Sequence, residues 1–459
     1  ICEQIVNRPR NTPPYNSMGV FFIITMTTST TPALNTGQQA AADGFFQFLF
    51  DDKPELIISG PGGVGKTYLM GYLINETLPR YHKTCELMNI KPEFTEVVMS
   101  ATTNKAADVL GQATGNHTET IHSFLNLKVK DDFATGRSTL TKGSGWMVHR
   151  KKIIFVDESS MIDTALRNKI LEGTHESKIV YVGDHCQLAP IMEPISPIYR
   201  DNLPFYELKQ PVRNAGQPAL MRVCQQLRET VETGEFWPIQ AIPGVIDWLT
   251  NEEAEQEIQN HFAQQATSSR ILAYTNPRVV QFNDYIRGLR NLPPEFIAGE
   301  FLINNSAIRI GKTMISVEEE LKILRQNSIT RVVGIDKDVF LEVRDTTLES
   351  TNGAVYHEVP VPVDMTHYNS LIKYYQQRKN WNRYFHLKNE YPDLRQRDAA
   401  TVHKSQGSTY DTVFIDMDNL SSCHQPTVAA RLLYVAFTRA RNRIVLFGNL
   451  TLKYGGLVR

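Results

Sequence analysis

The eight residues GPGGVGKT (60–67) constrain the fold more than any other stretch of the chain. They match the pattern G-x-x-x-x-G-K-[ST] and lie between the apolar run LIIS (56–59) and the helical run YLMGYLINETL. In that setting the backbone amides of a glycine-rich loop and a helix N-terminus cradle phosphates. The similar IGKT at 310–313 has Ser306 where the first glycine should stand, so we treat it as a chance match. The sequence therefore predicts an α/β domain built on a P-loop.

Short apolar runs alternate with helical stretches in two separate parts of the chain. The pattern is typical of parallel strands joined by crossover helices. A chain of 459 residues is long enough for two to four folding units. We predict two α/β domains from the further runs EVVMS (96–100), KIIFVD (152–157), KIVYVGD (178–184), RILAYT (270–275), TVFIDMD (412–418) and RIVLFG (443–448).

Two segments interrupt this pattern. Between about 300 and 363 the strands alternate in polarity, as in a small antiparallel barrel, and 367–390 is helical, aromatic and basic. Residues 126–150 have the pattern of a hairpin with a glycine-containing turn. We predict an N-terminal extension without fixed structure at 1–30, a first α/β domain at 31–125 and 151–206 with the hairpin insertion at 126–150, and a second at 207–299 and 398–459 with the insertion at 300–397.

Composition excludes some classes of protein. The 48 basic and 49 acidic side chains nearly cancel, so a nucleic-acid surface has to be a local patch. Five scattered cysteines without a Cys-x-x-Cys pair argue against a disulfide framework or a zinc site. The run GVFFIIT (19–25) is too short to span a bilayer, although Arg8 and Arg10 before it leave a signal peptide open as an alternative. We expect a cytoplasmic protein without membrane contact.

The residues around the P-loop predict nucleotide hydrolysis. Lys66 would reach the β- and γ-phosphates, and Thr67 would bind Mg²⁺. Asp157 and Glu158 end an apolar strand, where Asp157 suits a contact to Mg²⁺ and Glu158 suits polarising the attacking water. Acidic residues at a strand end can also be merely solvated. Gln187, in the turn VGDHCQL, is a neutral amide that could sense the γ-phosphate.

Nine motifs in one order resemble the series of superfamily 1 helicases, in particular the RecD-like branch with the helicases of T-even bacteriophages. The resemblance covers roughly residues 34–448. The motifs are LNTGQQ (34–39), GPGGVGKT, SATTNKAADVL (100–110), TIHSF (120–124), VDESSM (156–161), GDHCQLAPI (183–191), ELKQPVR (207–213), TVHKSQG (401–407) and LLYVAFTRAR (432–441).

This resemblance implies two RecA-like domains with ATP and Mg²⁺ between them. It implies that Gln38 reads the adenine, and that Arg213 and Arg439 reach the phosphates from the second domain as arginine fingers. A cation at a helix C-terminus, such as Arg439, needs no catalytic role, and that alternative remains. The rest of the implied ATP site is Gly60, Gly62, Gly63, Val64, Gly65 and Gly407.

The resemblance also implies a single-stranded DNA path across both domains, with contacts that hold the backbone without reading its sequence. The candidate residues are Thr103, Asn104, Lys105, Thr120, His122, Phe124, Asn276, Thr401, His403, Lys404 and Trp381. Phe124 could equally belong to the core.

Residues 371–397 carry seven basic and two acidic side chains, interleaved with the five rings of Tyr374, Tyr375, Trp381, Tyr384 and Phe385. Aromatic side chains there could stack on bases, or could form the core of an ordinary amphipathic helix. By resemblance, the insertion at 300–397 is an SH3-like barrel with an arm that braces DNA. The hairpin at 126–150 is by the same resemblance a strand-splitting pin, with Phe133 as the candidate wedge.

The predicted function is an ATP-dependent DNA helicase that moves 5′ to 3′, with the direction implied by the resemblance alone. We expect a monomer that binds single-stranded and forked DNA, with replication or single-strand-binding proteins as further candidate partners. Two alternatives stay open: a DNA-stimulated translocase that displaces proteins without efficient unwinding, and a P-loop NTPase that is no helicase. Thr409 stands where RecD-like sequences often have an acidic residue, so nucleotide preference is open.

Overall fold

The computed structural model describes residues 33–190, 193–210, 217–265, 268–311 and 313–459. All elements named below lie in the unit Asn35–Arg459. The predicted extension at 1–30 and the predicted arginine finger Arg213 lie outside the described residues. Among the described helices, none is long and apolar enough to cross a membrane.

The P-loop follows the second strand of a six-stranded sheet with the order β10-β1-β9-β7-β2-β3, in which every neighbouring pair is parallel. Every residue of β1 and β9 is buried, as expected for strands covered on both faces. The strands are β1 (Glu55–Ser59), β2 (Glu96–Ala101), β3 (Thr118–Thr120), β7 (Lys152–Asp157), β9 (Lys178–Gly183) and β10 (Phe205–Glu207).

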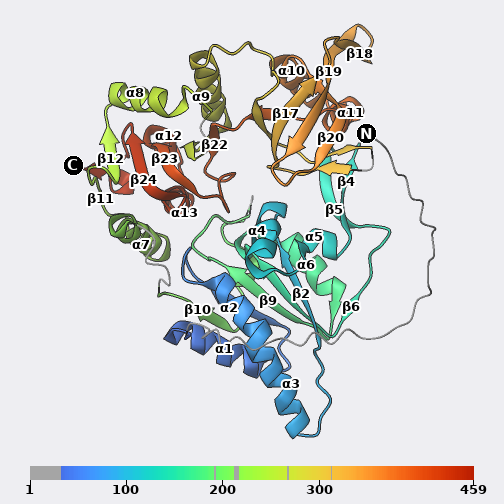
Figure 1. Cartoon of the computed structure of the whole chain (residues 1–459), viewed down its shortest axis with the longest axis vertical. Coiled ribbons are helices and arrows are strands. Elements are labelled where there is room, and N and C mark those ends of the chain that lie inside the picture. Colours follow the sequence, from blue (N-terminus) through green and yellow to red (C-terminus); the bar gives the residue numbers. More distant parts are fainter. Residues whose placement is uncertain (1–32, 191–192, 211–216, 266–267, 312) are drawn as a thin grey trace, which may run out of the picture. The chain divides into compact units, whose positions relative to one another are not determined.

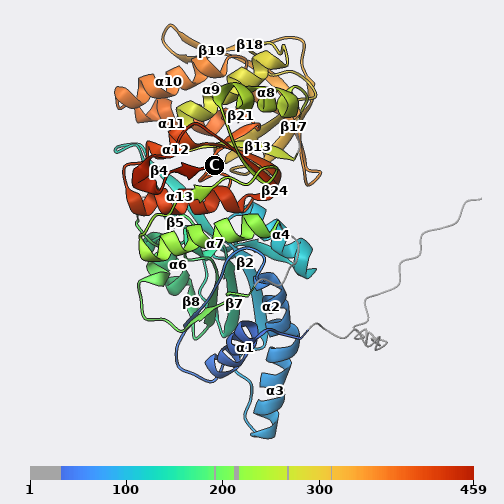
Figure 2. The same cartoon turned by 90° about the vertical axis from the view of Figure 1, so that its left-hand side faces the viewer.

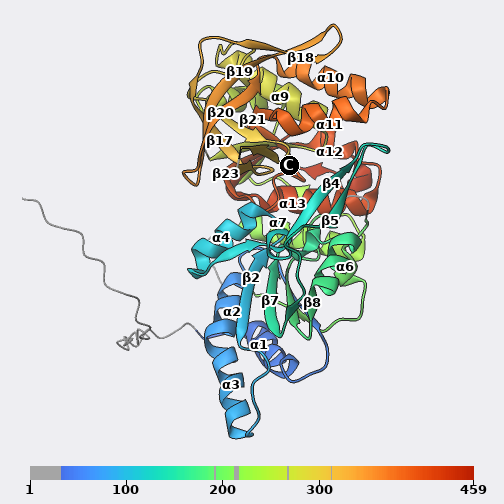
Figure 3. The ribbon, with the colours of Figure 1, turned by 90° about the vertical axis from the view of Figure 1, so that its right-hand side faces the viewer.

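Helices cover both faces of this first sheet, and Figures 2 and 3 show α2 and α6 on opposite sides of it. One face packs Ile57, Ile154 and Tyr181 against α6. On the other face the rings of Phe45 in α1 and Phe155 in β7 lie 5.9 Å apart. The helices are α1 (Thr36–Phe48), α2 (Lys66–Tyr72), α3 (Leu78–Leu87), α4 (Asn104–Thr114), α5 (Ile121–Phe124) and α6 (Thr164–Gly173), with a π-helical turn (Leu73–Thr77) between α2 and α3.

The second sheet has the order β12-β24-β23-β13-β22 and is also parallel throughout. One of its faces packs on α7, α12 and α13, and the other packs on α8 and α9 (Figure 1). The predicted fold class, α/β with two parallel sheets, is therefore confirmed. The elements are β12 (Ile246–Leu249), β13 (Ser269–Ala273), β22 (Ala399–Thr401), β23 (Tyr410–Asp416), β24 (Ala440–Phe447), α7 (Pro218–Thr233), α8 (Asn251–Phe262), α9 (Asn276–Leu289), α12 (Met417–Ser421) and α13 (Pro426–Thr438).

An antiparallel sheet lies between α9 and β22 in the sequence, and we call residues 300–397 the insertion. Its strands are β14 (Phe301–Asn304), β17 (Glu320–Gln326), β18 (Arg331–Asp336), β19 (Val339–Ser350), β20 (Val355–Pro362) and β21 (Leu394–Gln396), with the separate pair β15 (Ile308–Ile310) and β16 (Thr313–Ile315).

The helical stretch expected at 367–390 is divided into α10 (Met365–Gln377) and α11 (Trp381–Glu390). The break has a local cause. Lys379 has a left-handed backbone, with φ of 54°, and the Asn380 side chain caps α11 by accepting a hydrogen bond from the Arg383 backbone amide at 3.3 Å.

A hairpin of β4 (Leu127–Asp132) and β5 (Arg137–Lys142) rises from the first domain and packs on α11 (Figure 3). The rings of Phe133 and Phe385 meet edge to face at 5.2 Å. Asn389 donates to Asp131 at 3.0 Å. A Cβ on Gly136, in the hairpin turn, would lie 2.3 Å from the Trp381 ring. The hairpin tip is therefore held by the insertion.

The described C-terminal residues pair with the second domain. Strand β25 (Leu457–Val458) lies parallel to β11 (Ile239–Gln240), and the buried Tyr454 belongs to the core under the second sheet. Gly455 makes the turn between Tyr454 and β25, with φ of 89°. A further short parallel pair joins β6 (His149–Arg150) and β8 (Thr174–His175).

We predict that Gly455→Ala destabilises the protein by about 1–3 kcal/mol more than Gly234→Ala does. Both glycines have a left-handed backbone, with φ of 89° and 79°, so an alanine is strained at either position. Only at Gly455 would the new Cβ also meet a backbone atom, the Trp237 carbonyl oxygen at 2.3 Å. Denaturant unfolding of the two variants measures the difference.

Gly234 is the matched control because a Cβ there meets nothing within 4 Å. Equal losses of stability in the two variants would mean that the turn at Gly455 relaxes and the contact with Trp237 is not tight.

Candidate functional site

The loop 60–67 has the backbone of a phosphate cradle. Gly63 and Gly65 are left-handed, with φ of 82° and 79°, and Gly65 precedes the first turn of α2. A Cβ on Gly63 would meet nothing within 4 Å, so the loop is open where phosphates would approach. The Lys66 ammonium donates to the carbonyl oxygens of Gly60 and Pro61 at 2.8 and 3.0 Å. It lies across the loop, ready to exchange these carbonyls for phosphate oxygens.

Gln38 lies against the P-loop from α1. Its amide nitrogen donates to the Val64 carbonyl at 3.1 Å, and its oxygen accepts from the Asn35 backbone amide at 3.1 Å. Asn35 in turn caps α1 by accepting from the Gln38 backbone amide. This reciprocal capping fixes where α1 begins and holds Gln38, 2% exposed, at the loop.

Asp157 is the last residue of β7 and Glu158 follows it, at the carboxyl edge of the sheet where β1 leads into the P-loop. Glu158 has φ of 51°, a conformation that is costly for a residue with a side chain and that occurs often at functional sites. The Thr102 backbone amide and hydroxyl hold the carbonyls of Asp157 and Glu158 at 3.2 and 3.1 Å. Neighbouring β2 therefore stabilises this backbone turn.

The two carboxylates influence each other in the cleft. Burial raises the pKa of Glu158 to about 7, and Asp157 adds to the rise while Lys66 and Arg439 oppose it. Burial also raises the pKa of Asp157, against the charge of Lys66. A cationic ligand would stabilise the ionised forms of both. The donor set of Lys66, the Thr67 hydroxyl and two carboxylates thus fits a nucleotide with Mg²⁺.

Gln187, 7% exposed, is held from the second domain. Its side-chain oxygen accepts from the Gln406 amide at 2.9 Å, and Gln406 also donates to the Ser160 hydroxyl at 3.1 Å. Arg431 in α13 donates to the backbone carbonyls of His185 and Gln187, both at 2.5 Å. The role of Gln187 in sensing the γ-phosphate stays a prediction. The sequence analysis missed Arg431, because nothing local marks a contact across 244 positions.

Arg439 lies close enough to oppose the rise in the pKa of Glu158. Its guanidinium nevertheless forms its hydrogen bonds within its own domain. It donates to the Ser408 and Val435 carbonyls, both at 3.1 Å, and to the Thr438 hydroxyl at 3.0 Å. A Cβ on Gly407 would lie 4.0 Å from the Glu158 carboxylate. Gly407 and Arg439 thus approach Glu158, and the role of Arg439 as a finger stays a prediction.

A buried arginine that the sequence prediction missed joins the two domains. Arg228 in α7 is 4% exposed and contacts three carboxylates: Asp184 at 2.6 Å, Glu207 at 3.0 Å and Glu232 at 3.3 Å. Burial alone would raise the pKa of Asp184, but Arg228 and Lys66 hold it below its usual value. His185, Glu207 and Glu232 are close enough together to hold a metal ion, but the Arg228 guanidinium supplies the positive charge there.

The predicted DNA residues of the first domain have local partners. The Thr103 and Thr120 hydroxyls cap α4 and α5, accepting from backbone amides at 3.2 and 3.1 Å. Asn104 is exposed, whereas the Lys105 ammonium donates to the Ser408 hydroxyl at 2.7 Å. Burial lowers the pKa of His122. Two of these hydroxyls thus have a structural role that a threonine before a helical run already indicates.

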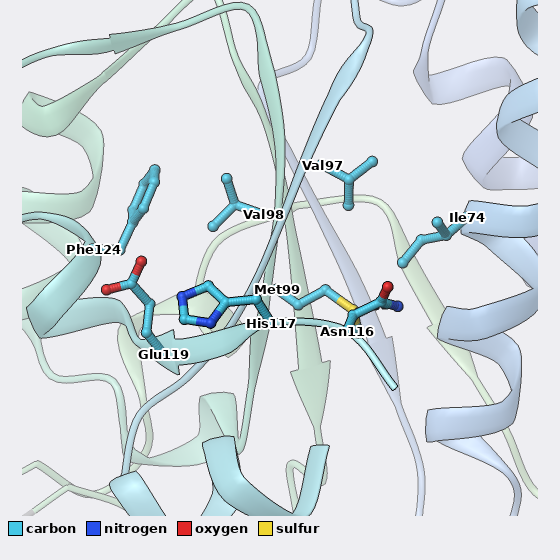
Figure 4. Close-up of a pocket in the computed structure, with 8 residues that line it drawn as sticks. All are labelled: Ile74, Val97, Val98, Met99, Asn116, His117, Glu119 and Phe124. Atoms are coloured by element: carbon cyan, nitrogen blue, oxygen red, sulfur yellow. Dashed lines mark hydrogen bonds between the residues drawn. The ribbon is translucent and has the colours of Figure 1, made fainter. Parts of the chain in front are cut away.

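Phe124 is partly buried. Its ring stacks on His149, with centroids 4.1 Å apart, and lines a hollow of about 280 Å³ beside β2 and β3 (Figure 4). None of the residues predicted for the nucleotide lines this hollow, so it is not the nucleotide site. The lining residues are Ile74, Val97, Val98, Met99, Asn116, His117, Glu119 and Phe124.

In the second domain the predicted DNA residues gather at the ends of β13 and β22. Asn276 is exposed in the first turn of α9, and His403 lies 6.4 Å from the Tyr274 ring. Thr401 is buried and accepts from the Lys404 backbone amide at 3.3 Å. Lys404 itself pairs with Glu318 of the insertion at 2.9 Å.

The aromatic side chains of the insertion have different environments. Tyr375 and Phe385 are each 2% exposed and belong to the core, so they are not available for stacking on bases. Trp381 is partly buried against the hairpin turn at Gly136, and Tyr374 is 40% exposed under Arg378. The amphipathic-helix interpretation therefore holds for two of the five rings.

Comparison with known proteins finds likeness in both domains. Residues 33–237 match the family model of an AAA domain, and residues 398–447 match that of a UvrD-like helicase C-terminal domain. The chain is 23% identical over 462 residues to the ATP-dependent DNA helicase Dda of Enterobacteria phage T4, covering 89% of this chain and 98% of that relative.

Solved structures of Pif1 helicases are also similar to this chain. The Bacteroides protein in complex with ADP-AlF3 and ssDNA has 13% identity and a TM-score of 0.49, with 91% of this chain and 94% of that one covered. The Candida albicans protein has 15% identity and a TM-score of 0.40, with 92% and 96% covered.

We predict that Arg228→Met destabilises the protein by about 3–5 kcal/mol, because it leaves the buried Asp184 carboxylate without its cation. Denaturant unfolding measures this loss. Arg222→Met is the control on the same helix, since Arg222 is exposed and should change stability by less than about 0.5 kcal/mol. Similar effects of the two substitutions would show that the Arg228 cluster does not stabilise the contact between the domains.

Proposed function

As a homologue of the phage T4 helicase Dda with an AAA domain and a UvrD-like helicase C-terminal domain, this chain is an ATP-dependent DNA helicase, and we propose that it moves 5′ to 3′ on single strands. The proposal includes forked DNA as substrate, Mg²⁺ as the partner of ATP, and a monomer as the active form. Replication or single-strand-binding proteins are further candidate partners, and the cytoplasm is the proposed location.

One observation carries the proposed coupling between ATP and DNA: a single loop, residues 402–409, contacts both candidate sites. At Gln406 it contacts Gln187 and Ser160, which flank the nucleotide cleft. Two residues earlier, Lys404 lies at the end of β22 among the residues proposed for the DNA path. A change in the cleft that moves Gln187 would therefore act directly on the loop that holds DNA.

The proposed chemistry uses residues from both sheets. Lys66 would bind the β- and γ-phosphates, and Thr67 and Asp157 would hold Mg²⁺, which neutralises phosphate charge when bound. Glu158 would orient the attacking water and accept its proton. Gln187 would contact the γ-phosphate, so that loss of this phosphate changes its contact with Gln406. Arg213 and Arg439 are proposed to stabilise the transition state from the second domain.

The function is tested by ATPase and unwinding assays on duplexes with either a 5′ or a 3′ single-stranded tail. We expect unwinding only from the 5′ tail and ATP hydrolysis that single-stranded DNA stimulates. Lys66→Ala should reduce hydrolysis by at least about 100-fold while leaving DNA binding measurable.

Other outcomes distinguish the alternatives. Stimulated hydrolysis without unwinding, together with displacement of a bound protein, would support a translocase. Weak hydrolysis that ignores DNA would support an NTPase that is no helicase. Unwinding from the 3′ tail would refute the proposed direction.

Gln406→Ala should lower DNA-stimulated ATP hydrolysis about three- to tenfold while changing hydrolysis without DNA less, because it removes two hydrogen bonds between the loop and the cleft. Steady-state hydrolysis with and without oligonucleotide measures both rates. Gln225→Ala is the control, because among the described residues the Gln225 side chain bonds only to Glu229 on the surface of α7. Equal losses of the two rates would argue against a coupling role for Gln406.

A further inference from the structure

Two cations and one carboxylate meet where the loop after β22 touches the insertion. The Lys404 ammonium lies 2.9 Å from the Glu318 carboxylate and donates to the Asn305 side-chain oxygen at 2.7 Å. One nitrogen of Arg395, in β21, donates to both oxygens of the same carboxylate at 3.1 and 2.9 Å. Glu318 is therefore the shared anion of two basic side chains that come from different parts of the chain.

This pairing is incomplete. The Nε atom of Arg395 is buried and has no hydrogen-bond partner among the described residues. Asp393 is the other acidic group nearby, but its carboxylate accepts from the Asn305 amide at 3.1 Å and from neither cation. One carboxylate thus serves two positive charges, and part of the Arg395 donor set is unused.

Glu318 is held in the cluster by its backbone. It lies in the turn between β16 and β17 with φ of 59°, a backbone conformation that residues other than Gly, Asn and Asp rarely adopt. Its amide donates to the Asn304 carbonyl at 2.7 Å. The side chain remains 25% exposed, and that of Lys404 28%, so solvent reaches the cluster. An anion arriving from solution can therefore compete for the cations.

We propose that Arg395 and Lys404 form a binding site for one phosphate group of the DNA backbone, and that the Glu318 carboxylate occupies this site when DNA is absent. This inference rests on the proposed function. One phosphate oxygen can accept from the Arg395 nitrogen that bonds Glu318 in this structure, while another oxygen accepts from Lys404. When DNA binds, a phosphate then takes the place of the Glu318 carboxylate beside the two cations. Glu318 therefore weakens the binding of DNA at this position.

The exchange predicts a gain in affinity when the competing charge is removed. Glu318→Gln in the full chain should bind a fluorescent oligothymidylate about two- to fivefold more tightly at low salt, which is the range expected for losing one partly exposed ion pair. The gain should shrink as salt increases, because added ions screen the same charges. Glu318→Asn, which tolerates the left-handed backbone, should give the same direction.

Arg395→Met should weaken binding and reduce the salt dependence by about 0.7 in the slope of log affinity against log salt, as for one lost phosphate contact on a single strand. Fluorescence anisotropy over a series of salt concentrations measures both quantities for every variant.

Asp345→Asn is the matched control. Asp345 pairs with Arg331 at 2.9 Å on the same insertion. The substitution therefore removes an equal charge outside the proposed site and should leave DNA affinity unchanged. Unchanged affinity in both Glu318 variants, or an equal gain in Asp345→Asn, would overturn the proposed exchange. Failure of the wild-type chain to bind single-stranded DNA would instead overturn the proposed function, and this inference with it.

Discussion

One buried guanidinium joins the two parallel sheets of this helicase. Arg228 belongs to the helix layer of the second sheet, and its strongest partners, Asp184 and Glu207, lie at the ends of β9 and β10 in the first. Separating a buried ion pair costs far more free energy than separating a pair at the surface, because a buried charge is left without a partner. This ion pair therefore holds the loop that carries Gln187 against α7.

Other contacts between the domains are single hydrogen bonds. The Lys105 ammonium donates to the buried Ser408 and the Gln406 amide donates to the buried Gln187, each bond contributing about 1–3 kcal/mol net. The buried Arg228 cluster therefore contributes more to the contact between the domains than either hydrogen bond does.

Much of the fold follows from local sequence, and the helicase resemblance drawn from ordered motifs is confirmed by the relatives. Buried parallel strands are continuous apolar runs, and the P-loop motif predicts the strand before it and the helix after it. What local sequence does not reveal depends on partners far along the chain. Arg228 and Arg431 look like any helical arginine, and Tyr375 and Phe385 look as suited to a DNA surface as to a core. Thr103 caps α4, as its position before a helix already indicates, and its contact with DNA stays a prediction.

The π-helical turn at Leu73–Thr77 has a consequence for the helix that begins at the phosphate loop. In such a turn, residues five apart lie above one another, so Leu73 and Leu78 both reach the core although an α-helix would place them on different sides. The turn thus absorbs one extra residue and restores the apolar stripe that Tyr81 and Cys85 continue. Removing a single residue there would rotate all of α3 relative to the loop, so the length of this segment is fixed as strictly as its composition.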